Sequence, residues 1–334
     1  MACVTGFLLF FFFITPAFTA NKLRNHFYKS SCPAAEELVR QTVQDYYLAD
    51  HAIAAGVIRL FFHDCFVRGC DGSILLDMSP YSDKAAEKSS PANIGLYGED
   101  VIDAAKFQLE NICPETVSCA DIVAFAARDA AVIAGIPFYS VPSGRRDGIV
   151  SLAEEVRSNL PAFFFDATKQ TKYFKNKGFS QEEMVVLVGA HSLGGAHCSS
   201  FAYRLYNFSD GRIQDPSIEP SYAQFLKLRC PAPKGVMAGA LYPNRKVDFG
   251  GESAMKLDGS YYSLLKQGMG LLESDQTLMK DTKTRRLVRK MNKHPRRWAE
   301  KFALAMIKLG KLDVLTGDQG EVRKTCRIVN KRGD

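Results

Sequence analysis

The chain has 334 residues, of which 46% are hydrophobic and 24% charged, and its formal net charge is +7. This composition excludes disordered and fibrous proteins and allows a large buried core. An excess of positive charge favours acidic partners over basic ones.

An uncharged apolar run opens the chain from Phe7 to Ile14, and small residues follow it up to Ala20. The run is too short to span a bilayer and is typical of a secretory signal, although no positive charges precede it. We therefore expect residues 1–20 to be a signal peptide. Residues 21–334 would then form a single secreted domain without a membrane span.

Nine cysteines are present, and Cys3 would leave with the signal, so that eight remain. An even number of cysteines in a secreted chain indicates disulfides, here four, whose pairing the spacing alone does not determine. The sequon Asn207-Phe208-Ser209 predicts glycosylation at Asn207 and agrees with secretion.

Helical patterns recur along the chain. Apolar residues at helical spacing, proline at a first turn and a capping box at residues 180–183 are the signals. The predicted helices cover about residues 33–48, 52–67, 117–135, 184–190 and 301–310. Residues 76–99 and 207–259 have no such pattern and are expected to be irregular. Alternation typical of strands is rare, so a mainly α fold is predicted.

A dense group of polar side chains lies in RLFFHDCFVRGCDGS, residues 59–73. In a helix, Arg59 and His63 would share one face, one turn apart. Their apolar surroundings would hold His63 neutral beside the Arg59 charge, which suits proton transfer next to stabilised negative charge. The alternative is a buried structural histidine, with Arg59 paired to an acid. This stretch alone slightly favours the alternative.

Oxygen atoms in the same stretch have the chemistry of a calcium site, which takes six to eight hard ligands. They belong to Asp64, Val67, Gly69, Asp71 and Ser73. A zinc site of His63, Cys65 and Cys70 is the alternative. It is weaker, because an oxidising compartment favours a disulfide between the two cysteines.

The motif LVGAHSLGGAHC, residues 187–198, contains a second histidine of interest. His191 follows an apolar helix, so its ring should project into the interior. His197 would lie roughly 240° further around a helix, so the two histidines are not expected to share a metal.

Positive charges gather between Lys280 and Lys301, and no aromatic residue interrupts them from Lys283 to Arg297. They could favour an acidic wall polysaccharide, although a solvated helix face is the simpler interpretation. Without interleaved aromatic residues, and with a secretory signal, nucleic acid is not an expected ligand.

Together these motifs resemble the secretory, class III plant haem peroxidases. The likeness covers essentially the whole mature chain, and two separate histidine motifs with eight cysteines in family order make it specific. The matching stretches are FYKSSCP at 27–33, RLFFHDCFVRGCDGSILLD at 59–77, CPETVSCADI at 113–122, VPSGRRD at 141–147, NLPAFF at 159–164, LVGAHSLGGAHC at 187–198, ESDQ at 273–276 and TGDQGEVRKTCRIVN at 316–330.

The resemblance implies a mainly α fold whose distal and proximal helical halves sandwich haem b. His191 would be the axial iron ligand, with Asp275 hydrogen-bonded to its outer nitrogen. His63 would take a proton from H₂O₂ and pass it to the leaving oxygen, while Arg59 stabilises negative charge. Phe62 would pack against the haem.

The resemblance also implies that Asn93 and Glu87 orient His63 through hydrogen bonds. Pro161 would line the site of phenolic donors, including lignin-type wall phenols. The protein would be a monomer outside the cell rather than in the vacuole. Asp121 and Arg145 would form a buried ion pair. The implied disulfides are Cys32–Cys113, Cys65–Cys70, Cys119–Cys326 and Cys198–Cys230.

Two calcium sites belong to the family pattern. Every protein ligand of the distal site is present, at Asp64, Val67, Gly69, Asp71 and Ser73, with Glu87 reaching the ion through water. The proximal site would use Ser192, Ser253, Asp258 and the carbonyl of Lys256. Gly250 stands where the family has an aspartate, so this second site is expected to be weak or empty.

Overall fold

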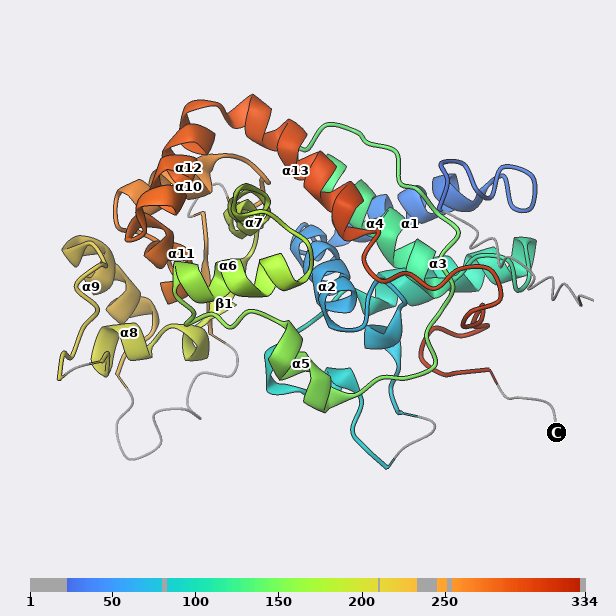
Figure 1. Ribbon diagram of the computed structural model, residues 1–334, viewed down its shortest axis with the longest axis horizontal. Coiled ribbons are helices and arrows are strands. Elements are labelled where there is room, and N and C mark those ends of the chain that lie inside the picture. Colours follow the sequence, from blue (N-terminus) through green and yellow to red (C-terminus); the bar gives the residue numbers. More distant parts are fainter. Residues whose placement is uncertain (1–22, 80–82, 210, 233–244, 251–253, 331–334) are drawn as a thin grey trace, which may run out of the picture.

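The computed structural model describes residues 23–79, 83–209, 211–232, 245–250 and 254–330 (Figure 1). The predicted signal peptide and Ser253 lie outside these residues. In the described part the chain is mainly helical, and its two strands, β1 (Gly195–His197) and β2 (Lys246–Asp248), form one small antiparallel sheet. No helix in these ranges is both long and apolar enough to cross a membrane.

The first half of the chain packs around one buried helix. This helix, α4 (Cys119–Ile133), packs against α1 (Ala35–Ala49), α2 (Ile53–Val67) and α3 (Glu99–Ile112). Its first thirteen residues are buried, and the Ser118 side chain caps it by accepting the Asp121 N–H at 3.2 Å. The predicted helices at 33–48, 52–67 and 117–135 are therefore confirmed.

The second half is built around α7 (Gln181–Leu187), which packs against α6 (Ala167–Asn176), α12 (Thr282–Lys293) and α13 (Pro295–Leu309). The capping box of Ser180 and Glu183 is present at its start. The remaining helices are α5 (Ala153–Asn159), α8 (Tyr203–Tyr206), α9 (Pro220–Arg229), α10 (Ser260–Lys266) and α11 (Glu273–Gln276). In Figure 1, α13 runs between the two groups of helices.

The prediction of irregular structure across residues 207–259 was wrong in part, because α9 and β2 lie there. Pro220 at the first turn and Glu219, whose carboxylate accepts the Tyr222 N–H, start α9. Tyr222 and Leu226 bury this helix in a separate small core. The helical angle assumed for His197 was also wrong, since this residue lies in β1. Residues 83–98 contain only short 3₁₀ turns, and α3 begins at Glu99.

All four implied disulfides are present. Their sulfur pairs join Cys32 to Cys113, Cys65 to Cys70, Cys119 to Cys326 and Cys198 to Cys230. The second of these excludes zinc binding by Cys65 and Cys70, because disulfide sulfurs are no longer thiolates.

Candidate active site

A hydrogen-bond chain fixes the ring of His63, which is 8% exposed. The Asn93 amide nitrogen donates to the Glu87 carbonyl at 2.7 Å, so the Asn93 oxygen faces the His63 Nδ1, 2.6 Å away. An amide oxygen can only accept, so Nδ1 must carry the proton. Nε2 is therefore left with a free lone pair, which makes His63 a base directed away from Asn93.

The charge state of His63 follows from its surroundings. Burial and the Arg59 charge lower its pKa to about 3, and the hydrogen bond to Asn93 opposes this shift only partly. The ring is therefore neutral at physiological pH, as the sequence predicted.

Arg59 lies one turn before His63 on α2. Its guanidinium donates to the carbonyls of Ala92 and Gly95, each at 3.2 Å, and makes no ion pair within the described residues. The alternative in which Arg59 pairs with an acid was wrong. Because Ala92 and Gly95 flank Asn93, Arg59 also holds the turn that orients His63.

Phe62 extends from α2 into an aromatic cluster. Its ring lies 4.2 Å from that of Phe66 and 6.0 Å from that of Phe174, measured between centroids. Phe62 itself is only partly buried. One face of its ring is thus held by packing, while part of it stays accessible.

The imidazole of His191, just after α7, is also fixed by a hydrogen bond at its Nδ1. His191 lies in η4 (Val188–Ser192), and its Nδ1 is 2.8 Å from the Asp275 Oδ1. Phe249 stacks on the ring at 4.6 Å and 10°. Asp275 is 2% exposed, whereas the His191 side chain is 35% exposed. A carboxylate acceptor fixes the proton on Nδ1 and leaves Nε2 free to bind a metal.

These two imidazoles fit a haem. One has the carboxylate partner that raises the basicity of a metal-ligating histidine, and the other is a neutral base beside an arginine. A pocket nearby is lined by Ala55 of α2 and Tyr97 and by Leu193 and Gly194, which follow His191 in the chain, but His63, Arg59 and His191 are not among its lining residues.

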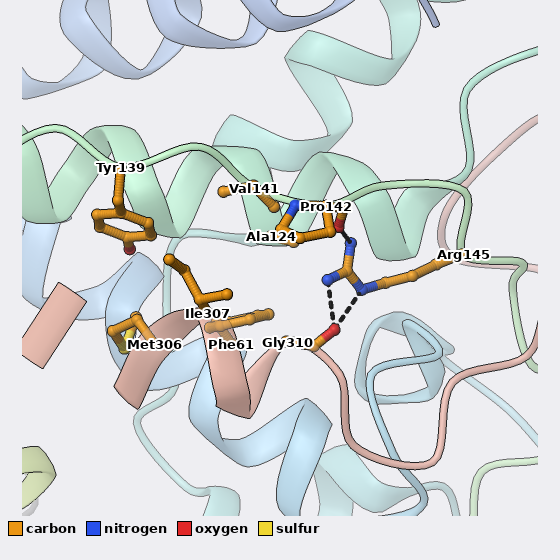
Figure 2. A pocket seen from close by; sticks show the side chains of 9 residues that line it. All are labelled: Phe61, Ala124, Tyr139, Val141, Pro142, Arg145, Met306, Ile307 and Gly310. Carbon is orange, nitrogen blue, oxygen red and sulfur yellow. Dashed lines mark hydrogen bonds between the residues drawn. The ribbon is translucent and has the colours of Figure 1, made fainter. Parts of the chain in front are cut away.

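A further cavity lies between α2, α4 and α13. Figure 2 shows it lined by Phe61, Tyr139, Met306 and Ile307, among other residues, with Arg145 donating to the Gly310 carbonyl. Arg145 also pairs with Asp121 at 2.6 Å, which confirms the predicted buried ion pair. This cavity is therefore part of the packing, and none of the candidate site residues lines it.

The loop after α2 gathers buried oxygen atoms without enough partners. Asp64 accepts the Gly72 N–H, and Asp71 accepts the Ser73 N–H, each at 3.0 Å. The Ser73 hydroxyl and both Glu87 carboxylate oxygens are buried and have no hydrogen-bond partner among the described residues. Buried polar atoms of this kind point to an ion or water.

The charges of this loop lead to the same conclusion. Burial raises the pKa values of Asp64, Asp71 and Glu87, and mutual repulsion raises those of Asp64 and Glu87 further. A cation would relieve both effects. The described residues contain no group of three or more His, Cys, Asp or Glu placed to hold a metal. A cation here would therefore also need the Ser73 hydroxyl and backbone carbonyls.

Val67 and Gly69, whose carbonyls the sequence predicts as ligands, lie at the end of α2 and in the turn that follows it. Gly69 has a φ of 102°, in the left-handed region that favours glycine, and the Cys65–Cys70 disulfide closes the turn around it. The Val67 carbonyl accepts a hydrogen bond from Lys177 at 3.2 Å, which leaves it a second lone pair.

The predicted proximal calcium ligands are only partly gathered. The Ser192 hydroxyl accepts the Asp258 N–H at 3.0 Å, so these two residues are adjacent. Lys256 is exposed, and Gly250 provides no carboxylate. The Ser253 contribution lies outside the described residues.

Two surface predictions can be placed. Asn207 is exposed, so its amide is accessible to a glycan. Pro161 is partly buried, and Phe163 and Phe164 beside it are 38% and 51% exposed. Sequence reasoning missed Phe249 and Tyr261, which contact His191 and Asp275. The signals in the sequence were the position of Phe249 directly before Gly250, in an expected ligand segment, and the stretch SYY at 260–262, which also matches the family.

Comparisons with known proteins all match this chain to peroxidases. A family model described as "Peroxidase" matches residues 39–294. Peroxidase 5 of Vitis vinifera is 47% identical over 92% of each chain. Peroxidase 1 of Zea mays is 47% identical over 95% of this chain and 86% of its own. Peroxidase 25 of Arabidopsis thaliana is 44% identical over 92% of each chain.

Proposed function

This chain belongs to the peroxidase family, as a haem peroxidase of the plant class III type, and on that premise we propose that His63, Arg59 and His191 are its active-site residues. The observation that carries the proposal is the pair of imidazoles whose Nδ1 atoms are both engaged, by Asn93 and by Asp275. Each therefore offers Nε2, one as a base and the other as a ligand.

Haem, held by the His191 Nε2, supplies the redox chemistry of the reaction when bound. The His63 Nε2 accepts a proton from H₂O₂ and returns it to the oxygen that leaves as water. Arg59, whose side chain already lies on the same face of α2, stabilises the negative charge that develops as the O–O bond breaks. Asn93 and the Glu87 carbonyl keep the His63 proton on Nδ1, so that Nε2 stays available.

Phenolic donors would then be oxidised one electron at a time near Pro161. The exposed rings of Phe163 and Phe164 support this proposal, because aromatic faces at the surface offer stacking to a phenol.

Addition of H₂O₂ to the haem-loaded protein tests the function. A Soret band that changes on addition and recovers with a phenol is expected. A band that does not respond would indicate a haem-binding wall protein with little turnover. If the purified protein had no Soret band after haem was supplied, a purely structural, calcium-stabilised protein would be the better reading.

We further propose calcium in the distal loop, held by Asp64, Asp71, Ser73 and the carbonyls of Val67 and Gly69. The unpartnered Ser73 hydroxyl and Glu87 carboxylate support it. For the proximal position, the missing carboxylate at Gly250 favours weak binding or none.

The protein is proposed to act outside the cell and to bind acidic wall polysaccharide through α12 and the start of α13. Exposed cations on this surface are Lys283, Arg286, Arg289, Lys290, Lys293, Arg296 and Arg297. Of these, only Lys290 makes an ion pair with a described residue, Glu182. Lys283 lies in the first turn of α12, where the helix dipole disfavours positive charge, and Arg286 follows directly after that turn. Positive charges that lower the stability of a helix are expected to be kept where they bind a polyanion.

Retention on immobilised polygalacturonate tests this surface. The triple variant Lys283→Glu, Arg286→Glu and Arg289→Glu is expected to bind roughly tenfold more weakly, from about 0.5 kcal/mol for each exposed charge. The control reverses three exposed lysines elsewhere, at Lys29, Lys266 and Lys311, and so has the same net charge. Equal weakening of both variants would mean that net charge alone accounts for the binding.

A further inference from the structure

The Asp275 carboxylate has two hydrogen-bond donors on one oxygen. Its Oδ1 accepts from the His191 Nδ1 at 2.8 Å and from the Tyr261 hydroxyl at 3.0 Å. Its Oδ2 is buried and has no hydrogen-bond partner among the described residues. The three side chains come from η4, α10 and α11, so the arrangement exists only in the folded chain.

The surroundings of Tyr261 leave its hydroxyl one role, which is to donate a hydrogen bond to Asp275. Its side chain is 3% exposed, and its ring lies edge-on to that of His191, with centroids 6.3 Å apart. A carboxylate oxygen offers only acceptor sites, so the phenol must donate its proton to Asp275. A hydrogen bond to a carboxylate draws negative charge toward the donor.

We propose that Tyr261 is a positioning residue that sets the electron donation of His191. Because Tyr261 shares Oδ1, Asp275 pulls less strongly on the His191 N–H. The imidazole then has less imidazolate character than an unshared aspartate would give it. Outer hydrogen-bond partners of a ligating histidine tune the metal in this way. The inference rests on the proposed function, in which His191 binds the haem iron.

The test is Tyr261→Phe in the haem-loaded protein, with Tyr262→Phe as the matched control. Tyr262 is the next residue on α10 and is also buried, but its hydroxyl donates to the carbonyls of Val185 at 2.7 Å and Val186 at 3.4 Å instead. Both changes remove one buried hydroxyl that donates to protein acceptors. Only the first removes a bond to Asp275, so a general packing defect would affect both variants.

Tyr261→Phe is expected to shift the ferric-to-ferrous equilibrium toward ferric haem by roughly tenfold, which corresponds to about 59 mV for one electron. The iron–histidine stretching frequency of the ferrous protein should rise. Tyr262→Phe should change neither value. No change in Tyr261→Phe, or the same change in both variants, would overturn the proposal.

A second measurement avoids dependence on a variant that folds poorly. Replacing the Tyr261 phenol with 3-fluorotyrosine keeps its shape and makes it a stronger donor, so the potential should move in the opposite direction. An unchanged potential would count against the proposal. If the wild-type protein had no iron–histidine band at all, the assignment of His191, and not the role of Tyr261, would be wrong.

Discussion

Replacing His63 with alanine is expected to slow the reaction with H₂O₂ by about 10²–10⁴-fold, the usual contribution of a general acid–base group, while haem stays bound. His191 and Asp275 are untouched by the change, so the Soret band should remain. Stopped-flow measurement of the peroxide-dependent absorbance change gives the rate constant. His294→Ala, at an exposed histidine after α12, is the control and should react at the wild-type rate.

The pH profile of the same reaction provides an independent check. The pKa of His63 is lowered to about 3, and the reaction needs the neutral ring. The rate constant should therefore be flat from about pH 5 to 8 and should fall only as the pH approaches this pKa from above. A fall centred near the ordinary histidine pKa, or a His63→Ala variant that still reacts rapidly, would mean that the assigned base is wrong.

Removing calcium from the wild-type protein is expected to lower the free energy of unfolding by about 3–4 kcal/mol. This is the stabilisation that a ligand provides at roughly 100 to 1,000 times its dissociation constant. Whether the Asp64→Asn variant is less stable than wild type should depend on calcium. With calcium it should be less stable than wild type, because it lacks a ligating carboxylate. Without calcium it should be at least as stable, because it no longer repels Asp71 and Glu87.

Denaturant unfolding with and without a chelator measures this reversal. Asp100→Asn, at an exposed position in α3, is the control and should respond to chelation as wild type does. If Asp64→Asn lost as much stability on chelation as wild type, the cation would have to be bound elsewhere. Counting tightly bound calcium in the purified protein also tests the proximal site, since a second ion would contradict the expected effect of Gly250.

Helices α2, α4 and α7 were predictable because their signals are local, whereas α10 and α11, which carry Tyr261 and Asp275, were not predicted. The capping box of Ser180 and Glu183, the apolar residues of α4 and the one-turn spacing of Arg59 and His63 all act within a few residues. Helix α9 was missed although Pro220 marks its start. Its burial comes from a small separate core near the Cys198–Cys230 disulfide, which periodicity does not reveal.

By itself the sequence determined the helical class, the local geometry of α2 and, through family resemblance, the four disulfides and the peroxidase function. The tertiary structure decided which nitrogen of each imidazole is free, because Asn93 is 30 residues from His63 and Asp275 is 84 residues from His191. It alone placed Tyr261 on the oxygen that His191 uses. Hydrogen bonds between distant residues depend on how whole elements pack, and the spacing of residues along the chain does not encode that packing.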